Sequence, residues 1–285
     1  MSVPIFLTLF TPTYNRAHTL HRVYESIRSQ TLQQLDGAYL FEWIIVDDGS
    51  QDGTGALIKQ WQNESDFPIR YTYQENRGKP AASRLGIEMA RGELFLFADS
   101  DDAFVPETFE TFHAVWREFS AEERRRCGGI GVLCRDQYGR RVGRDYPVEG
   151  RLIPAEEAVF GWRELGLGET WAALKTENLK KAFMIPEEAR HLKFIPESFF
   201  WSRTLFETPH YSYFLNKVLR VYYRNEEEKE ALSLSPRTRY PEAFFFESCW
   251  FVRRYGSVLF RYPSLYLRHL LKCIYFFSKV KRAKR

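Results

Sequence analysis

An acidic run, Asp99-Ser100-Asp101-Asp102, holds the residue types of this chain that are best suited to chemistry. It follows an apolar segment, 94–97, that lacks alternating polar residues, which predicts a short strand buried on both faces. Carboxylates crowded at a strand end repel one another unless a cation or a donor neutralises them. Hard oxygen ligands at this spacing suit Mg²⁺ or Mn²⁺, which in turn suits a diphosphate. Alternatively, Asp101 or Asp102 caps a helix that begins near Pro106.

Three other polar segments follow apolar runs in the same way. The expected strands, each with its following loop, are 3–10 with 11–16, 41–46 with 47–54, 69–73 with 76–79, and 94–97 with 99–102. Helical spacing or helix punctuation follows each loop, at 17–30, 55–62 and 81–90 and from about residue 106. This repetition predicts an α/β fold with a mostly parallel central sheet and helices on both faces. Because ligands bind at the carboxyl ends of parallel strands, we expect a ligand site where the four loops meet.

Composition bounds the remaining possibilities. The chain has 285 residues, 44% hydrophobic and 27% charged, typical of one large soluble domain or two small ones. Its four cysteines form no Cys-x-x-Cys pair, so reduced cytosolic thiols are expected, and we find no signal-peptide pattern. Five of the last seven residues are basic, and removing those five from the 41 basic residues leaves 36 against 37 acidic ones. The positive charge therefore belongs to the tail, and no nucleic-acid partner is expected.

The second half of the chain is less regular. We expect strands at 127–134, 170–175 and 218–223, and helices at 151–162, after 198, at 240–255 and from 263 to the end. The segment 265–277 is too short and too interrupted by charge to span a bilayer. Its aromatic and leucine residues, with the basic end, suit a helix lying in a membrane interface. The alternative is a helix docked on the domain with a disordered basic end.

Taken in order, the polar motifs closely resemble those of glycosyltransferase family 2 across residues 3–120. The matching residues are Thr11-Pro12-Thr13-Tyr14-Asn15-Arg16, Val46-Asp47-Asp48-Gly49-Ser50 with Asp52 and Thr54, Asn76-x-Gly78-Lys79, and Asp99-Ser100-Asp101-Asp102. A shorter block at 193–203 is similar to bacterial members, in which a Pro-Glu pair and a tryptophan open a helix; here these are Pro196, Glu197 and Trp201. One departure is Arg84, which stands where many members have an asparagine.

The resemblance implies a GT-A fold, a nucleotide-diphosphate sugar donor (a UDP-sugar favoured), a bound Mn²⁺ or Mg²⁺, and inversion at the anomeric carbon. It also implies roles for single residues. Thr11, Pro12, Thr13 and Arg16 would line the nucleotide pocket, Asp48 would bond the base edge, and Lys79 would lie near the nucleotide or the diphosphate. Asp99, Ser100 and Asp101 would form the Asp-x-Asp motif at the donor. Asp99 and Asp101 would hold the metal, with Asp101 the stronger candidate for direct ligation.

Inversion by single displacement needs one base opposite the leaving group and no covalent nucleophile. Glu197 is the candidate base, because the dipole of the helix it precedes favours an ionised carboxylate, and Asp102 is the second candidate. The alternative is that Glu197 only caps that helix.

The sequence thus predicts two domains and one function. Residues 1–225 would form the GT-A domain, with a nucleotide-sugar half at 1–120 and an acceptor half at 121–225, and residues 226–285 would form a helical extension. The expected enzyme transfers a sugar to a saccharide or lipid-linked acceptor in bacterial surface polysaccharide synthesis, at the cytoplasmic face of the inner membrane. The alternatives are a non-catalytic nucleotide-sugar or carbohydrate-binding protein and a sugar nucleotidyltransferase; the latter would need a glycine-rich loop, and 11–16 has no glycine.

Overall fold

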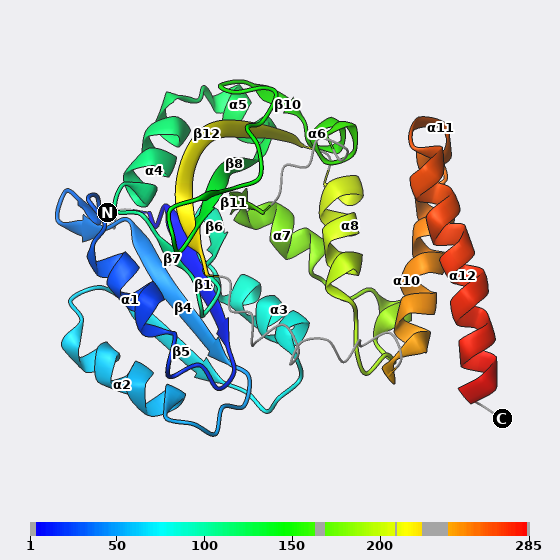
Figure 1. Ribbon diagram of the computed structural model, residues 1–285, viewed down its shortest axis with the longest axis horizontal. Helices are drawn as coiled ribbons and strands as arrows, with labels where there is room; N and C mark the ends of the chain where they lie inside the picture. Colours follow the sequence, from blue (N-terminus) through cyan, green and yellow to red (C-terminus); the bar gives the residue numbers. More distant parts are fainter. Residues whose placement is uncertain (1–3, 163–168, 209, 224–238, 284–285) are drawn as a thin grey trace. The chain divides into compact units, whose positions relative to one another are not determined.

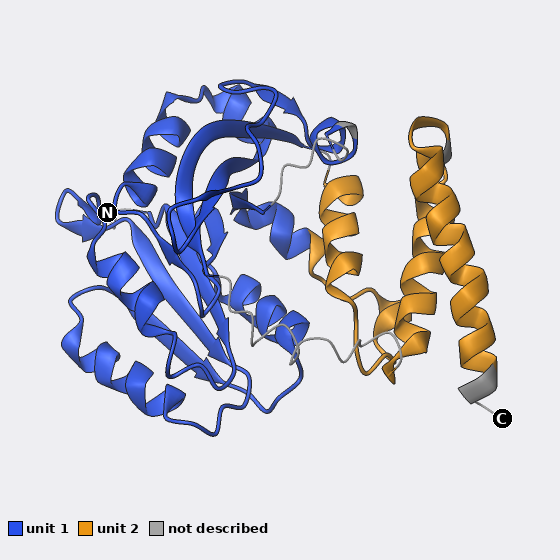
Figure 2. Cartoon of the chain, viewed as in Figure 1, with its two compact units in different colours: residues 1–181, 209–224 blue, residues 182–208, 225–285 orange. Residues whose placement is uncertain are grey.

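The computed structural model describes residues 4–162, 169–208, 210–223 and 239–283 (Figure 1). The chain divides into two compact units, of which unit 1 is Met1–Lys181 with Pro209–Arg224, and unit 2 is Ala182–Thr208 with Asn225–Arg285 (Figure 2). Residues 182–208 are therefore grouped with the C-terminal helices, whereas the sequence predicted them within the first domain. The predicted domain limits, 1–225 and 226–285, stay a prediction.

Unit 1 is built on a large mixed sheet. The strands of unit 1 are β1 (Leu7–Thr13), β2 (Gln34–Leu35), β3 (Ala38–Tyr39), β4 (Phe41–Asp47), β5 (Ile69–Tyr73), β6 (Leu94–Phe97), β7 (Ala103–Phe104), β8 (Cys127–Asp136), β9 (Arg141–Val142), β10 (Leu152–Pro154), β11 (Thr170–Lys175) and β12 (Tyr211–Tyr222). Of these, β2 and β3 pair with each other in a separate two-stranded sheet. The helices of unit 1 are α1 (His21–Arg28), α2 (Thr54–Glu64), α3 (Lys79–Met89), α4 (Thr108–Glu118), α5 (Ala121–Arg126), α6 (Ala155–Gly161) and α7 (Thr176–Ala182), the last of which ends at the first residue of unit 2.

The strand order in the main sheet is β10-β12-β8-β11-β6-β1-β4-β5, with β7 paired to β12 and β9 to β8. The strands β6, β1, β4 and β5 run parallel, as the repeated strand-loop-helix pattern predicted. The second half of the sheet is mixed, because β11 runs antiparallel to both β6 and β8 while β12 runs parallel to β8. The sheet is therefore parallel only where the first 120 residues build it.

Side chains of the central strands are buried on both faces of the sheet. Leu9 of β1 and Trp43 of β4 belong to one core cluster with residues of α1, α2 and α4. Phe10, the next residue of β1, faces the other way and lies against Gly86 of α3, where an added Cβ would come within 2.1 Å of the ring. These strands are mostly apolar and buried because helices cover both faces of the sheet (Figure 1).

Several predicted elements match the structure closely, and two differ from it. The strands 69–73, 94–97 and 170–175 are confirmed to the residue. The helix predicted at 151–162 is wrong in its first turn, because 152–154 form β10, which pairs with β12. Strand β12 also begins seven residues earlier than predicted, at Tyr211.

Unit 2 is helical and rich in aromatic contacts. Its elements are the short 3-10 turn η2 (Glu187–Ala189) and the helices α8 (Glu197–Glu207), α10 (Pro241–Arg254), α11 (Val258–Arg261) and α12 (Pro263–Ala283). Phe251 of α10 stacks on His269 of α12 at 3.8 Å between ring centroids, and Phe206 of α8 contacts Phe251 edge-on. In the described part of the chain, no helix is both long enough and apolar enough to cross a membrane.

Candidate active site

The four polar loops singled out in the sequence lie at one edge of the sheet. Residues Thr13 and Asp47 are register partners at the ends of β1 and β4, and Asp47 is in turn paired with Tyr73 at the end of β5. Strand β6 runs parallel to β1 on its other side, so the acidic run follows at the same edge. This is the arrangement predicted from the strand pattern, and it is where open parallel sheets bind ligands.

The loops after β1 and β4 are fastened to each other by hydrogen bonds. The amide of Asn15 donates to Ser50 Oγ at 2.9 Å. The carboxylate of Asp52 accepts from the amides of Ala17 at 3.1 Å and Thr54 at 3.0 Å. Burial raises the pKa of Asp52, but the hydrogen bond from the Thr54 hydroxyl and those from the Ala17 and Thr54 amides stabilise the ionised carboxylate more strongly, so the net shift of the pKa is downward. The walls of the candidate site are thus held by the chain itself.

Asp48 holds the loop after β5 in place. Its Oδ1 accepts from Gln74 Nε2 at 2.6 Å and from the Arg77 amide at 2.9 Å, and its Oδ2 accepts from the Gly78 amide at 2.7 Å. The neighbouring Gly49 has φ of +90°, and an added Cβ there would lie 2.9 Å from the Asn76 amide nitrogen. The carboxylate predicted to bond a base edge therefore already binds three donors of its own chain.

The other residues predicted to line the nucleotide pocket differ in their surroundings. Thr11 is fully buried, and its hydroxyl accepts from Trp43 Nε1 at 3.0 Å inside the core. Thr13 is 3% exposed, and its Oγ1 is buried without a hydrogen-bond partner among the described residues. Pro12 is buried and Arg16 is half-buried, with its amide donating to Thr54 Oγ1. The unpartnered hydroxyl of Thr13 suits contact with a bound polar ligand.

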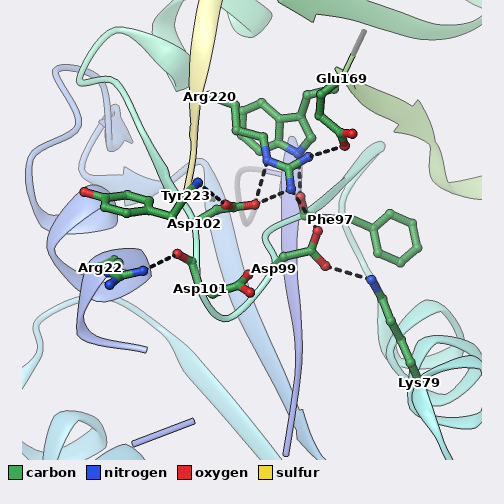
Figure 3. Close-up of polar contacts among 10 residues, drawn as sticks. Arg22, Lys79, Phe97, Asp99, Asp101, Asp102, Glu169, Arg220 and Tyr223 are labelled. Atoms are coloured by element: carbon green, nitrogen blue, oxygen red, sulfur yellow. Dashed lines mark hydrogen bonds and ion pairs between the residues drawn. The ribbon is translucent and has the colours of Figure 1, made fainter. Parts of the chain in front are cut away.

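The acidic run is bound by basic side chains from two distant elements (Figure 3). Lys79, the first residue of α3, donates from Nζ to Asp99 Oδ1 at 2.9 Å. Arg220 of β12 donates from Nη2 to Asp99 Oδ2 at 2.9 Å and from Nε to Asp102 Oδ2 at 2.8 Å. The other oxygen of Asp102 accepts from the Tyr223 amide at 3.0 Å. Two of the three carboxylates predicted to need neutralising, Asp99 and Asp102, are therefore bound by donors of the protein itself.

The loop between β6 and β7 is also fixed through its backbone. Arg22 of α1 donates from Nη1 to the Asp101 carbonyl at 2.9 Å, and its guanidinium lies over the Tyr223 ring at 4.1 Å. Helix α4 begins after Glu107 and has no side-chain cap. The alternative that Asp101 or Asp102 caps this helix is therefore wrong, because strand β7 intervenes and Asp102 binds Arg220 and Tyr223 instead.

Charge and burial have different net effects on the pKa values of Asp99 and Asp102. Burial raises the pKa of Asp99, but the positive charges of Lys79 and Arg220 outweigh it and lower the pKa overall. Burial raises the pKa of Asp102 to about 7, against the opposing effect of Arg220. Burial lowers the pKa of Arg220, and the charges of Asp102 and Asp99 reverse this to a net rise, so the guanidinium stays charged.

The donor set fits a divalent cation only in part. Among the described residues, no group of three or more His, Cys, Asp or Glu side chains is arranged to hold a metal ion. Two carboxylates, Asp99 and Asp101, stand in the predicted motif, with Ser100 buried between them. Mg²⁺ in phosphate-transferring sites is commonly held by one or two carboxylates together with substrate phosphates, and this pair meets that requirement.

Arg220 is the main residue that the sequence analysis did not assign to the site. It lies 118 and 121 positions from the two aspartates it binds. The available signal was a charged residue inside an apolar strand segment, since a buried arginine requires a buried partner. Nothing in that pattern identified the partner, which only the pairing of β12 with β7 and β8 brings close.

Glu197, the candidate base, lies in unit 2 as the first residue of α8. The residue before it, Pro196, occupies the N-cap position, and no side-chain cap is present. Glu197 is half-buried, and its Oε1 accepts from Trp201 Nε1 at 3.2 Å, one helical turn on. Its predicted role as a base is thus neither supported nor opposed by a contact within its own unit.

Comparison with known sequences points to one family. Residues 8–121 match the model described as glycosyl transferase family 2. Glycosyltransferase GlyA of Streptococcus pneumoniae is 33% identical over 116 residues, which are 41% of this chain and 16% of GlyA. Dolichyl-phosphate beta-glucosyltransferase of Homo sapiens is 38% identical over 101 residues, which are 34% of this chain and 31% of that protein. The chain thus spans less than a third of the length of either relative.

Solved structures share the architecture. TarS of S. aureus in complex with UDP-GlcNAc has a TM-score of 0.63 at 20% identity, covering 87% of this chain and 66% of that one. Mannosyltransferase PcManGT from Pyrobaculum calidifontis, in complex with GDP-Man and Mn²⁺, has a TM-score of 0.57 at 17% identity, covering 99% and 77%. At these identities the likeness establishes the fold, which is the GT-A glycosyltransferase fold predicted from the sequence.

Proposed function

We propose that this chain, whose residues 8–121 match the model of glycosyl transferase family 2, is an inverting, metal-dependent glycosyltransferase of that family. The donor would be a nucleotide-diphosphate sugar, with a UDP-sugar favoured, and the acceptor a saccharide or lipid-linked sugar of a bacterial surface polysaccharide. One observation carries the proposal. Within the matched residues, the loop holding Asp99 and Asp101 meets Lys79 at the carboxyl edge of the parallel strands.

The chemistry required at this edge is the neutralisation of a departing diphosphate. A bound Mn²⁺ or Mg²⁺ would act there as a Lewis acid on the phosphate oxygens. Asp99 and Asp101 would hold the cation, and Ser100 would lie against the donor between them. Lys79 has a half-exposed ammonium on the first residue of α3, which can approach an anionic group while staying paired with Asp99.

The nucleotide would lie against the loops after β1 and β4. The Thr13 hydroxyl, which lacks a hydrogen-bond partner among the described residues, would bind it, and the half-buried Arg16 would lie beside it. Pro12 would make an apolar contact with the nucleotide. Thr11, which is buried in the core, would hold this part of the pocket wall in place. Asp48 would act on the base edge either directly or by ordering the loop at residues 76–78 that it binds.

We retain Glu197 as the proposed base for the acceptor hydroxyl. Asp102 ranks second, because it is 4% exposed and both of its oxygens already accept hydrogen bonds from Arg220 and Tyr223. A general base must reach the proton it removes, which a carboxylate held in this way does poorly.

The proposal is tested by nucleotide release. The full chain is incubated with UDP-GlcNAc and with GDP-Man, each with a saccharide acceptor mixture, with Mn²⁺ or with EDTA. We expect release of the nucleotide diphosphate from one donor and its loss in EDTA. Donor binding by calorimetry without any release over the acceptor mixture would favour the non-catalytic binding protein. Release that EDTA leaves unchanged would remove the metal from the proposal.

We also propose that helix α12 lies on an anionic membrane surface, which would place the enzyme at the cytoplasmic face of a bacterial inner membrane. His269 and Phe276 on one side of α12 are buried against α10. The opposite side exposes six large apolar residues, which are Leu267, Leu270, Leu271, Ile274, Tyr275 and Phe277. No acidic residue occurs in α12, whereas Arg268, Lys272, Lys279 and Lys281 lie along it. Lys284 and Arg285 lie outside the described residues.

Membrane binding predicts a charge-sensitive result. Replacing Leu271 and Ile274, which are 65% and 64% exposed, by glutamate should reduce binding to vesicles containing phosphatidylglycerol by about tenfold or more. Vesicle sedimentation at low and high salt measures this, and Tyr138→Glu, at a residue that is 72% exposed in unit 1, is the control. Equal sedimentation of the native chain and the double variant would contradict the proposal, as would equal binding to neutral phosphatidylcholine vesicles.

A further inference from the structure

The guanidinium of Arg220 occupies the interior of the acidic loop. Its side chain is 6% exposed, and β12 presents it at an irregularity in the pairing with β8, between Val218 and Arg220. On its other side β12 pairs with β7, the strand that directly follows the acidic run, with Arg220 opposite Phe104. A bulge commonly re-aims a side chain, and here the sheet itself brings a cation to the aspartates.

The guanidinium of Arg220 contacts three carboxylates. It donates to Asp102 through Nε and Nη2 and to Asp99 through Nη2, and its Nη1 lies 3.5 Å from Glu169 Oε1 (Figure 3). The second oxygen of Asp99 binds Lys79. Both oxygens of Asp99, half of the predicted metal-binding pair, are therefore held by fixed positive groups of the chain.

A cation approaching Asp99 must compete with these groups. The positive charges of Lys79 and Arg220 repel a metal cation that approaches within a few ångströms, so they weaken its binding to Asp99. Partial burial strengthens this repulsion because less water is present to screen it. A diphosphate changes this balance, because it adds negative charge and further oxygen ligands at the same edge.

We propose that Arg220 is a built-in counter-ion of the acidic loop, which makes binding of a divalent cation at Asp99 and Asp101 depend on the nucleotide diphosphate. The inference rests on the proposed function, since it presumes a diphosphate donor. Arg220 acts through Asp99 and Asp102 and is a positioning residue. The consequence for the enzyme is that the cation enters with the donor and is not held by the empty site.

Removing the guanidinium should strengthen binding of the bare metal. In Arg220→Gln, nucleotide-free Mn²⁺ affinity, measured by electron paramagnetic resonance of the full chain, should rise about tenfold or more. The native chain should bind Mn²⁺ tightly only with UDP or GDP present. Arg220→Lys, which keeps the charge and loses the forked geometry, should stay close to the native affinity without nucleotide.

A paired variant separates the charge effect from misfolding. Arg220→Gln leaves Asp102 buried without its main partner, which destabilises a fold. The double variant Arg220→Gln/Asp102→Asn removes both charges, so it restores neutrality in the buried pair while Asp99 still lacks its counter-ion. Its nucleotide-free Mn²⁺ affinity should exceed that of the single variant Asp102→Asn by about tenfold. Circular dichroism and thermal melting verify that each variant is folded.

The outcomes distinguish the counter-ion role of Arg220 from the proposed metal-dependent function. If folded variants lacking Arg220 bind Mn²⁺ no more tightly than their matched partners, the counter-ion role is overturned and Arg220 is a structural residue only. If the native chain binds Mn²⁺ tightly without nucleotide, the dependence on diphosphate is overturned. If the native chain binds no Mn²⁺ even with UDP or GDP, the metal-dependent function itself fails.

Discussion

Asp101→Asn is expected to reduce kcat/KM for nucleotide release by about a hundredfold or more, because it removes a charge that a bound cation and diphosphate require. The substitution keeps the shape of the side chain. It also keeps the backbone contact that holds the loop, in which Arg22 donates to the Asp101 carbonyl at 2.9 Å. The loss should therefore appear as a raised requirement for Mn²⁺ and a lowered kcat in a protein that melts near the native temperature.

Asp145→Asn is the matched control, because Asp145 is exposed, and its ion pair with Arg141 is a surface pair worth little. Steady-state assays over a range of Mn²⁺ concentrations measure both variants. Near-native turnover of Asp101→Asn at low Mn²⁺ would show that this carboxylate is not a metal ligand. A loss of the same size in Asp145→Asn would show that the assay reports general stability.

Glu197→Gln should lower kcat by roughly a hundredfold to ten-thousandfold, the range in which a positioned base contributes, with donor affinity nearly unchanged. Glutamine has the same shape as glutamate, and its side-chain oxygen can still accept the hydrogen bond from Trp201 Nε1. The local helix start, with Pro196 at the N-cap, does not depend on the charge. Turnover and donor binding should therefore separate in this variant.

Single-turnover assays measure the chemical step, and calorimetry with UDP or GDP measures donor binding. Glu188→Gln, at an exposed glutamate of the same unit, is the control. Loss of donor binding in Glu197→Gln would make Glu197 part of the donor site. Turnover close to native would remove it as the base, and Asp102→Asn would be the next variant to assay.

The local sequence pattern was sufficient to predict the strands that carry the donor half of the candidate site. The strand 94–97 is an apolar run, and 69–73 is a β-branched and aromatic segment that contains Arg70. Pro68 and Gly92 lie just before them and polar residues follow, so composition and chain punctuation together indicate their limits. Their order along the chain, with a helix between each pair, fixed a parallel arrangement and hence the shared edge of the four loops. The family resemblance then attached roles to residues on those loops.

The same kind of pattern failed where long-range pairing decides structure. Residues 152–154 fall within the helix predicted at 151–162, but pairing with β12 makes them a strand. The full length of β12 likewise depends on its parallel contact with β8, from a segment far away in the sequence. Strand formation is context-dependent, since a strand is stabilised by the partner that it meets.

The sequence by itself determined that acidic side chains would gather at a sheet edge and that something positive had to meet them. The family resemblance placed Lys79 near the nucleotide or diphosphate, and its contact with Asp99 came only from the structure. Only the tertiary structure decided that Arg220 binds Asp99 and Asp102 and that Arg22 holds the Asp101 carbonyl. The physical reason is that residue types determine which buried charges need a partner. Which residue becomes that partner depends on the pairing of strands more than a hundred positions apart in the sequence.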